Sequence, residues 1–182
     1  KKICKESSVN IDEKNSKIYL NQIDRFKNDN ITADDVHGEA RSKEDKIISQ
    51  IYSIYEKELR RLNCCDFGNL LMHCLYIFKK NNKILKQYQN QFKYILVDEY
   101  QDTDTCQDTF LKLLSQKHKN ICCVGDDDQS IYSWRGAEIE NFLSFSKTYK
   151  NTKIIKLEQN YRSTQNILSA ASGLIANNDG RL

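Results

Sequence analysis

Two adjacent carboxylates, Asp98 and Glu99, follow directly on an apolar run at residues 92–97 that is rich in aromatic and β-branched side chains. A strand covered on both faces of a parallel sheet has such a continuous apolar run, so we expect an interior strand here. Ligands of these sheets bind at the carboxyl ends of the strands. The sequence therefore predicts that this strand carries both acids to a ligand site.

The two acids have different expected roles. In nucleotide hydrolysis one carboxylate holds Mg²⁺, usually through a water ligand, and a second group orients the water that attacks the γ-phosphate. We assign Asp98 to the metal and Glu99 to the general base. The alternative, which these two residues alone leave open, is a charged turn that caps the following helix.

Length and composition limit the class of protein. With 182 residues, 39% of them hydrophobic, the chain can form one medium domain or two small ones. No apolar run approaches the roughly 18 residues that suggest a membrane span, and the polar start lacks a signal-peptide pattern, so we expect a soluble protein with no membrane contact. The net charge of +3 arises in the first half, which suits a polyanion partner without requiring one.

The seven cysteines have no regular spacing, and four of them form two adjacent pairs, Cys64-Cys65 and Cys122-Cys123. The lack of a paired CxxC spacing argues against a zinc site. In the apolar run at 120–124, cysteine is expected to act as a small buried hydrophobe. This cysteine usage predicts a reducing, intracellular compartment.

The first half of the chain is expected to be helical. Ser42 can cap an amphipathic helix. Asp66 can cap a second one, whose expected inward residues are Leu70, Leu71, Cys74, Leu75 and Phe78. Residues 1–17 and 28–41 lack an apolar period and are expected to be loops. The expected helices, in order, cover residues 18–27, 43–62, 67–80 and 83–89.

The second half is expected to alternate between strands and helices, which predicts parallel pairing through right-handed crossovers. Polar turns follow each strand, so three strand ends should converge on one crevice. The expected strands are 92–97, 120–124 and 153–157, and the expected helices are 105–118, 137–149 and 164–178.

The residues in these turns carry a family resemblance. DEYQDT at 98–103, GDDDQSIYSWRGA at 125–137 and LEQNYRST at 157–164 look like motifs II, III and IV of the UvrD/Rep/PcrA group of superfamily 1 helicases. DFGNLL at 66–71 resembles the DFDDLL segment of that group. The Gly68-Asn69 departure replaces two aspartates and leaves the role of this segment open.

The resemblance implies a 3′ to 5′ DNA helicase, driven by ATP and Mg²⁺, that acts on single-stranded and duplex DNA in repair or replication. Its fold would be α/β: residues 92–182 would form part of a RecA-like (P-loop NTPase) core domain, incomplete here. Residues 1–91 would form mostly a helical inserted domain. The expected location is the nucleus in a eukaryote and the cytoplasm in a bacterium.

The resemblance also implies nucleotide-binding roles for three further residues. Gln129 would sense the γ-phosphate by hydrogen bonding to it or to the attacking water. Arg162 would reach the same phosphate, and Tyr161 would stack on the adenine. An arginine in that role stabilises the charge that develops during transfer. The alternatives are a turn amide that satisfies backbone groups for Gln129, and ordinary surface residues for the other two.

Tyr132, Trp134 and Arg135 are the expected DNA-binding residues. Aromatic side chains in proteins that bind single strands stack on bases, and arginine adds phosphate or cation–π contacts. The resemblance places Tyr132 and Trp134 against unpaired bases. The alternative for Trp134 is burial in the core.

The sequence contains no GxxxxGK[ST] loop, which cradles phosphates in such enzymes, and no counterpart of motifs V and VI. We therefore expect this chain to be an internal fragment of a longer helicase, with the rest of that helicase as its partner. The fragment alone should lack ATPase activity and should expose apolar surface. Possible further partners are repair or replication proteins. The rivals are a non-catalytic nucleic-acid binding module with a helicase-like shell and a nucleotide-gated scaffold.

Overall fold

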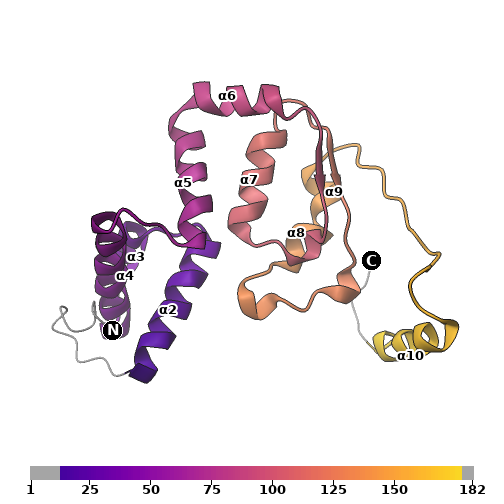
Figure 1. Cartoon of the computed structure of the whole chain (residues 1–182), viewed down its shortest axis with the longest axis horizontal. Coiled ribbons are helices and arrows are strands. Elements are labelled where there is room, and N and C mark those ends of the chain that lie inside the picture. The colour runs from indigo at the N-terminus through magenta and orange to yellow at the C-terminus, as the bar shows by residue number, and fades with distance from the viewer. Residues whose placement is uncertain (1–12, 178–182) are drawn as a thin grey trace.

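The first three helices of the computed structural model, which describes residues 13–177, form one helical body. They are α2 (Glu13–Asn28), α3 (Ala33–Glu39) and α4 (Lys43–Arg61), shown on the left of Figure 1. The helices pack around a core of buried side chains, namely Ile23, Val36, Ile48, Ile51 and Tyr52.

Local capping explains where these helices begin. Ser42 caps α4 as expected, and it forms a capping box with Asp45 in which each side chain accepts a hydrogen bond from the backbone N–H of the other residue. Thr32 and Asp35 form the same box at α3. The expected loop at 28–41 is therefore wrong over residues 33–39, because this box starts a helix that buries Val36, whereas residues 29–32 and 40–41 lie outside the helices as expected.

The end of α2 is equally well defined. Asn30 adopts a left-handed backbone conformation with φ of 56°. The N–H of Ile31 donates to the carbonyl of Phe26 at 2.7 Å, and the N–H of Asn30 donates to that of Lys27 at 3.0 Å, a Schellman arrangement that stops the helix. Helix α2 begins at Glu13, so residues 13–17 of the expected N-terminal loop are helical, and residues 1–12 lie outside the described residues.

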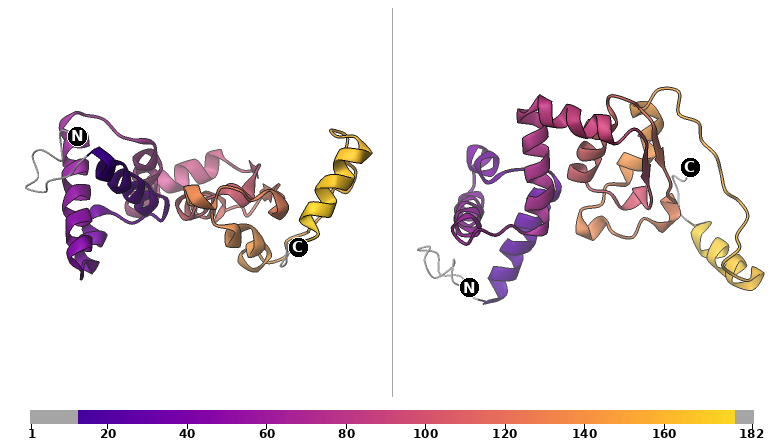
Figure 2. Two further views of the ribbon diagram at one scale, coloured as in Figure 1. Left: turned by 90° about the horizontal axis from the view of Figure 1, so that it is seen from below. Right: turned by 45° about the horizontal axis from the view of Figure 1, so that its top comes forward.

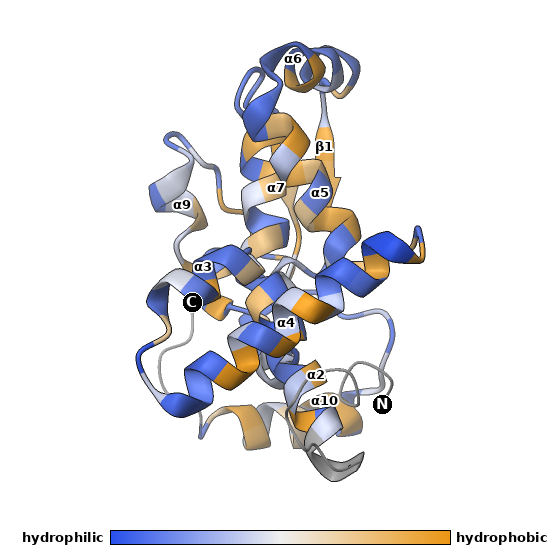
Figure 3. Cartoon of the chain, turned by 90° about the vertical axis from the view of Figure 1, so that its left-hand side faces the viewer, coloured by the Kyte–Doolittle hydropathy of each residue, from blue (hydrophilic) through white to orange (hydrophobic). Residues whose placement is uncertain are grey.

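Three further helices support the sheet. They are α5 (Phe67–Lys80), α6 (Asn82–Gln91) and α7 (Thr105–Ser115), and α5 packs beside α7 (Figure 1). Figure 3 shows the hydrophobic residues along α5, α7 and strand β1. The buried residues in this region are Met72, Leu75, Phe78, Leu85, Cys106 and Leu114.

The buried face of α5 agrees with the expected one at Leu75 and Phe78, which are both buried, and differs from it elsewhere. Asp66 caps the helix as expected, accepting a hydrogen bond from the N–H of Asn69 at 2.8 Å. Leu70 and Cys74, both expected to point inward, are exposed, whereas Met72 is buried. Met72 is buried because it packs with Leu75 against Cys106 of α7, a partner that the local period does not specify.

The sheet consists of two parallel strands, β1 (Ile95–Val97) and β2 (Ile121–Cys123), joined by α7 as the crossover. Leu96 pairs with Cys122 in the register. Ile95 packs toward the core, whereas Leu96 is 81% exposed and Cys122 is also exposed. Only one face of the sheet is covered in the described chain, so the expected burial of β1 on both faces and of Cys122 is wrong, and the expected exposed apolar surface is present.

The expected third strand at 153–157 does not form. Ile154, Ile155 and Leu157 are between 67% and 84% exposed, and the sheet contains only β1 and β2 among the described residues. A strand needs a hydrogen-bonding neighbour, and this segment runs apart from the sheet to α10 (Gln165–Ile175), which stands away from the other helices in Figures 1 and 2. Two strand ends therefore meet, not three.

The segment between β2 and the extended stretch contains only short elements. The single helix expected at 137–149 is divided into α8 (Ile139–Leu143) and α9 (Phe145–Thr148). Two 3₁₀ turns precede them, at Asp127–Gln129 and Ser133–Arg135. Across residues 13–177, no helix combines the length and apolarity needed to span a bilayer.

Candidate functional site

The two strands end side by side in acidic turns. Strand β1 stops at Val97, and Glu99 takes a left-handed conformation with φ of 50° before a 3₁₀ turn at Tyr100–Asp102. The N–H of Tyr100 donates to the carbonyl of Val124 at 3.0 Å, which ties this turn to the end of β2. Asp98 and Glu99 are both exposed at this end of the sheet.

A buried amide connects the two turns. Gln101, 1% exposed, donates from Nε2 to Glu99 Oε2 at 2.7 Å and accepts at Oε1 from the N–H of Asp126 at 3.1 Å. Asp126 Oδ2 in turn accepts from Gln129 Nε2 at 2.7 Å. We call this series of hydrogen bonds, from Glu99 to Gln129, the Gln101 bridge. It places two of the sequence-predicted catalytic residues in one network.

Gly125 leaves the room that the bridge needs. A Cβ atom at this position would lie 2.6 Å from Gln101 Oε1 and 2.8 Å from a ring carbon of Phe142. Both distances are shorter than van der Waals contact, so a larger residue would displace the amide. The family motifs highlight Glu99 and Gln129. Sequence reasoning missed the role of Gln101, whose only signal is its place within the DEYQDT segment.

Replacing Gln101 with leucine is expected to destabilise the chain by about 1–3 kcal/mol, because the part-buried N–H of Asp126 loses its acceptor. Chemical denaturation measures the change in the free energy of unfolding. The matched control is Gln116→Leu, since Gln116 is an exposed amide at the end of α7. Equal stability of the two variants would contradict the bridge.

A buried tyrosine holds the β1 turn from behind. Tyr100 is 1% exposed, and its hydroxyl donates to Asp108 Oδ1 at 2.6 Å. Burial, together with this hydrogen bond to a carboxylate, raises the pKa of Tyr100 far above its ordinary value, so the hydroxyl stays protonated and acts as a donor. Lys112 pairs with the other oxygen of Asp108 at 2.5 Å. The turn that carries Glu99 is therefore anchored by the buried hydrogen bond between Tyr100 and Asp108.

The loop after Gln129 presents aromatic side chains to solvent. Trp134 is 69% exposed, so the alternative of a buried tryptophan is wrong. The rings of Tyr132 and Trp134 lie 6.2 Å apart, and the Arg135 guanidinium lies 5.2 Å from the first ring centroid and 5.9 Å from the second. We call residues 132–135 the aromatic loop. Its flat faces and its cation suit unpaired bases and phosphates.

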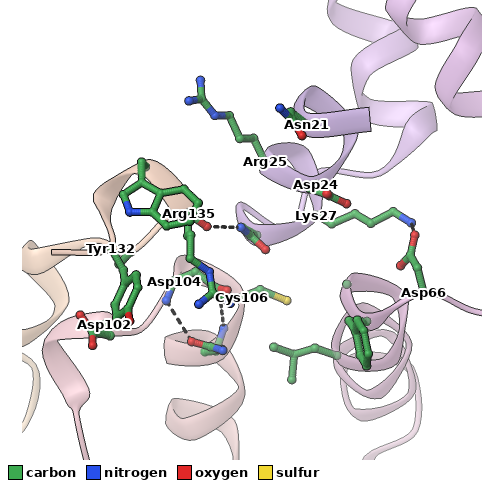
Figure 4. A pocket seen from close by; sticks show the side chains of 17 residues that line it. Asn21, Asp24, Arg25, Lys27, Asp66, Asp102, Asp104, Cys106, Tyr132 and Arg135 are labelled. Carbon is green, nitrogen blue, oxygen red and sulfur yellow. Dashed lines mark hydrogen bonds and ion pairs between the residues drawn. The ribbon is translucent and has the colours of Figure 1, made fainter. Parts of the chain in front are cut away.

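A pocket of about 740 Å³ lies between the aromatic loop, the C-terminal half of α2 and the start of α5 (Figure 4). Asp104 in its wall has a pKa raised by burial. The Oδ1 atom of Asp102 is buried without a hydrogen-bond partner among residues 13–177. The lining includes Arg25, Phe67, Asp102, Asp104, Tyr132, Trp134 and Arg135.

A buried lysine fixes the other wall of this pocket. Lys27, 1% exposed, reaches Asp66 Oδ2 at 2.5 Å and Glu56 Oε1 at 2.7 Å, and its ammonium lies 4.9 Å from the centroid of the Tyr55 ring. Figure 4 shows Lys27 pointing toward Asp66. A Cβ at Gly68 would approach the Lys27 stem to 2.8 Å, so the Gly68 departure makes room for this buried cation.

Tyr161 and Arg162 are not brought to the Gln101 bridge. Tyr161 is 92% exposed, and within residues 13–177 Arg162 forms a hydrogen bond only through its backbone N–H, which donates to Asn160 Oδ1. Both residues lie on the extended segment that leads to α10. Their nucleotide-binding roles stay predictions.

The exposed carboxylate of Asp98 is a suitable type of ligand for a magnesium ion. Mg²⁺ binds oxygen ligands, keeps several waters and is held by one or two carboxylates together with substrate phosphates. No group of three or more histidine, cysteine or acidic side chains in residues 13–177 is arranged to hold a metal without such a substrate. The Asp126 carboxylate is already occupied by Gln129 and the N–H of Asp128.

The chain is α/β, with acidic and amide side chains beyond two parallel strands and an exposed aromatic loop beside them. Its residues 1–150 match the family model of the UvrD/REP helicase N-terminal domain. The chain belongs to this family.

Curated relatives agree with the family. ATP-dependent DNA helicase PcrA of Staphylococcus aureus is 43% identical over 181 residues, which is 100% of this chain and 25% of the relative. PcrA of Staphylococcus epidermidis is 46% identical over 176 residues, 96% of this chain and 24% of the relative. The chain thus spans about a quarter of the length of these relatives.

Proposed function

We propose that this chain is part of an ATP-dependent 3′ to 5′ DNA helicase that couples Mg-ATP hydrolysis to movement along single-stranded DNA and to unwinding. The observation that carries the proposal is the Gln101 bridge, which joins Glu99 to Gln129 immediately before the aromatic loop. Nucleotide chemistry and DNA contact would then lie on consecutive segments of one chain. The relatives named ATP-dependent DNA helicase support this activity.

The proposed chemical roles follow from position and residue type. Glu99 would accept a proton from the attacking water, and Gln129 would hydrogen-bond to that water or to the γ-phosphate. Asp98 would hold Mg²⁺ through a water ligand, and the metal would neutralise phosphate charge. Tyr161 would stack on the adenine, and Arg162 would stabilise charge on the γ-phosphate after its segment moves toward the sheet.

The proposed domain organisation assigns residues 92–182 to a RecA-like core domain and residues 1–91 to a mostly helical inserted domain. The parallel β1–β2 pair with its α7 crossover supports the first assignment, and the helical body of α2 to α4, with its own core, supports the second. The remaining strands, the phosphate loop and a second motor domain would come from the rest of a longer protein. We place that protein inside the cell, in DNA repair or replication.

The deciding experiment is ATP hydrolysis by the full-length protein, measured with and without single-stranded DNA. Stimulation of hydrolysis by DNA is the expected result. A folded protein that binds ATP and DNA without turnover would refute the motor and favour a non-catalytic binding module. The 182-residue chain alone is expected to show no turnover.

Trp134→Ala in the full-length protein is expected to weaken binding of an oligothymidine by about 5- to 150-fold, corresponding to ~1–3 kcal/mol per stacked base. Fluorescence anisotropy of a labelled oligonucleotide measures the dissociation constant. The control is Tyr76→Ala, because Tyr76 is a 63% exposed aromatic residue on α5 outside the pocket. Equal affinities of the two variants would remove the aromatic loop from the DNA contact.

A further inference from the structure

The C-terminal turn of α2 contacts both walls of the pocket in Figure 4 through two consecutive residues. Lys27 holds Asp66, the residue that caps α5, while Asn28 Nδ2 donates to the backbone carbonyl of Arg135 in the aromatic loop at 2.7 Å. Asn28 and Arg135 are 107 positions apart in the sequence. One helix end therefore joins the helical body to the aromatic loop.

The structure of the loop is adapted to this contact. Gly136, directly after Arg135, has a φ of 94°, which side chains rarely tolerate. A Cβ at Gly136 would lie 2.7 Å from Asn28 Nδ2, so the asparagine approaches the loop backbone where only glycine leaves space. The hydrogen bond and the close approach both involve the Asn28 amide, and they locate it against the backbone of Arg135 and Gly136.

The asparagine itself is held in place. It belongs to the last turn of α2, which the Schellman arrangement at Asn30 and Ile31 closes. Tyr52 donates from its hydroxyl to the carbonyl of Ile31 at 3.1 Å, and Ile23 and Phe26 anchor the helix in the core of the helical body. Asn28 can therefore restrain the backbone of the loop, in which residues 133–135 are exposed.

We propose that Asn28 is a positioning residue that sets the aromatic loop for single-stranded DNA. This inference rests on the proposed function, because it concerns how the DNA-contacting side chains are held. Asn28 does not stack on bases; its amide fixes the carbonyl of Arg135 and thereby the orientation of the Trp134 and Tyr132 rings. Without the amide donor the loop is no longer held, so DNA binding must order the loop itself.

The test uses tryptophan emission of the 182-residue chain, in which Trp134 is the only tryptophan. The variants are Asn28→Ala, which removes the side chain beyond Cβ, and Asn28→Asp, which keeps the size but removes the donor. The control is Gln22→Ala, because Gln22 is an exposed amide on the same helix outside the pocket. Emission wavelength, acrylamide quenching and oligothymidine affinity are measured for each, with far-UV circular dichroism as a check of folding.

Both Asn28 variants are expected to shift the Trp134 emission and to change its quenching before any DNA is added. Their oligothymidine affinity should fall by about two- to tenfold, the range that corresponds to one net hydrogen bond. Gln22→Ala should match the parent in all three measurements. If Asn28→Ala fails to fold, the isosteric Asn28→Asp decides the outcome.

Parent-like emission, quenching and affinity in a folded Asn28 variant would overturn the positioning role. A different failure separates the two proposals. If the emission shifts as expected but neither the parent chain nor the full-length protein binds oligothymidine, the proposed function is refuted while the contact between Asn28 and the loop stands.

Discussion

Glu99→Gln in the full-length protein is expected to lower DNA-stimulated ATP hydrolysis by about 10²- to 10⁴-fold, the usual contribution of a positioned general base. Glutamine has the size of glutamate and can still accept the hydrogen bond from Gln101, so the bridge to Asp126 persists. ATP affinity and folding should therefore stay near the parent values. A steady-state ATPase assay, with equilibrium nucleotide binding beside it, measures both quantities.

The matched control for this variant is Glu138→Gln. Glu138 is an exposed carboxylate that precedes α8 and makes no side-chain capping hydrogen bond there. It should retain parent activity. Turnover by Glu99→Gln at the level of this control would show that Glu99 is not the base.

The second large effect is expected from Lys27→Met, which should destabilise the chain by about 2–4 kcal/mol. Methionine preserves the aliphatic stem, but Asp66 and Glu56 lose the cation that compensates their partial burial. The expected loss is somewhat smaller than the roughly 3–5 kcal/mol for breaking a fully buried pair, because the Asp66 side chain is 22% exposed. Chemical denaturation beside Lys57→Met, an exposed lysine on α4, measures the difference.

The loss in Lys27→Met should also depend on pH. Burial acts to raise the pKa of Asp66, but hydrogen bonds from Lys27, Asn69 and Tyr55 outweigh it and hold the pKa below its ordinary value of 3.8. A lowered carboxyl pKa contributes stability above that value, and the contribution is lost as the pH falls through the folded pKa. The stability gap between parent and variant should therefore be at its full size well above pH 3.8 and should narrow as the pH falls below 3.8 through the folded pKa. A gap that stays constant through that fall would contradict this account.

Local signals predicted the elements that are specified by local interactions. Ser42 and Asp66 cap the two long helices where expected, because each cap bonds within three residues of itself. The polar composition of residues 28–41 predicts a loop, although Thr32 and Asp35 form a capping box that starts α3. In this segment the local capping signal is a better guide to the structure than the composition.

Other features depend on partners that are distant in the sequence. The inward face of α5 is set by α7, and residues 153–157 stay extended because no neighbouring strand binds them among the described residues. The same limit applies to the candidate site. The motifs indicated Glu99 and Gln129, but Gln101 bonds to Asp126, 25 positions away, and Asn28 bonds to Arg135, 107 positions away. No local period carries such contacts.

The last turn of α2 also determines which changes in chain length the protein can accept. Ile23 faces the core of the helical body, while Lys27 and Asn28 bind Asp66 and Arg135. Inserting one residue between Ile23 and Lys27 would rotate the two groups by about 100° relative to each other. The helix could then keep its core contacts or its end contacts, but not both, so we expect this interval of α2 to tolerate exposed substitutions and to reject insertions and deletions.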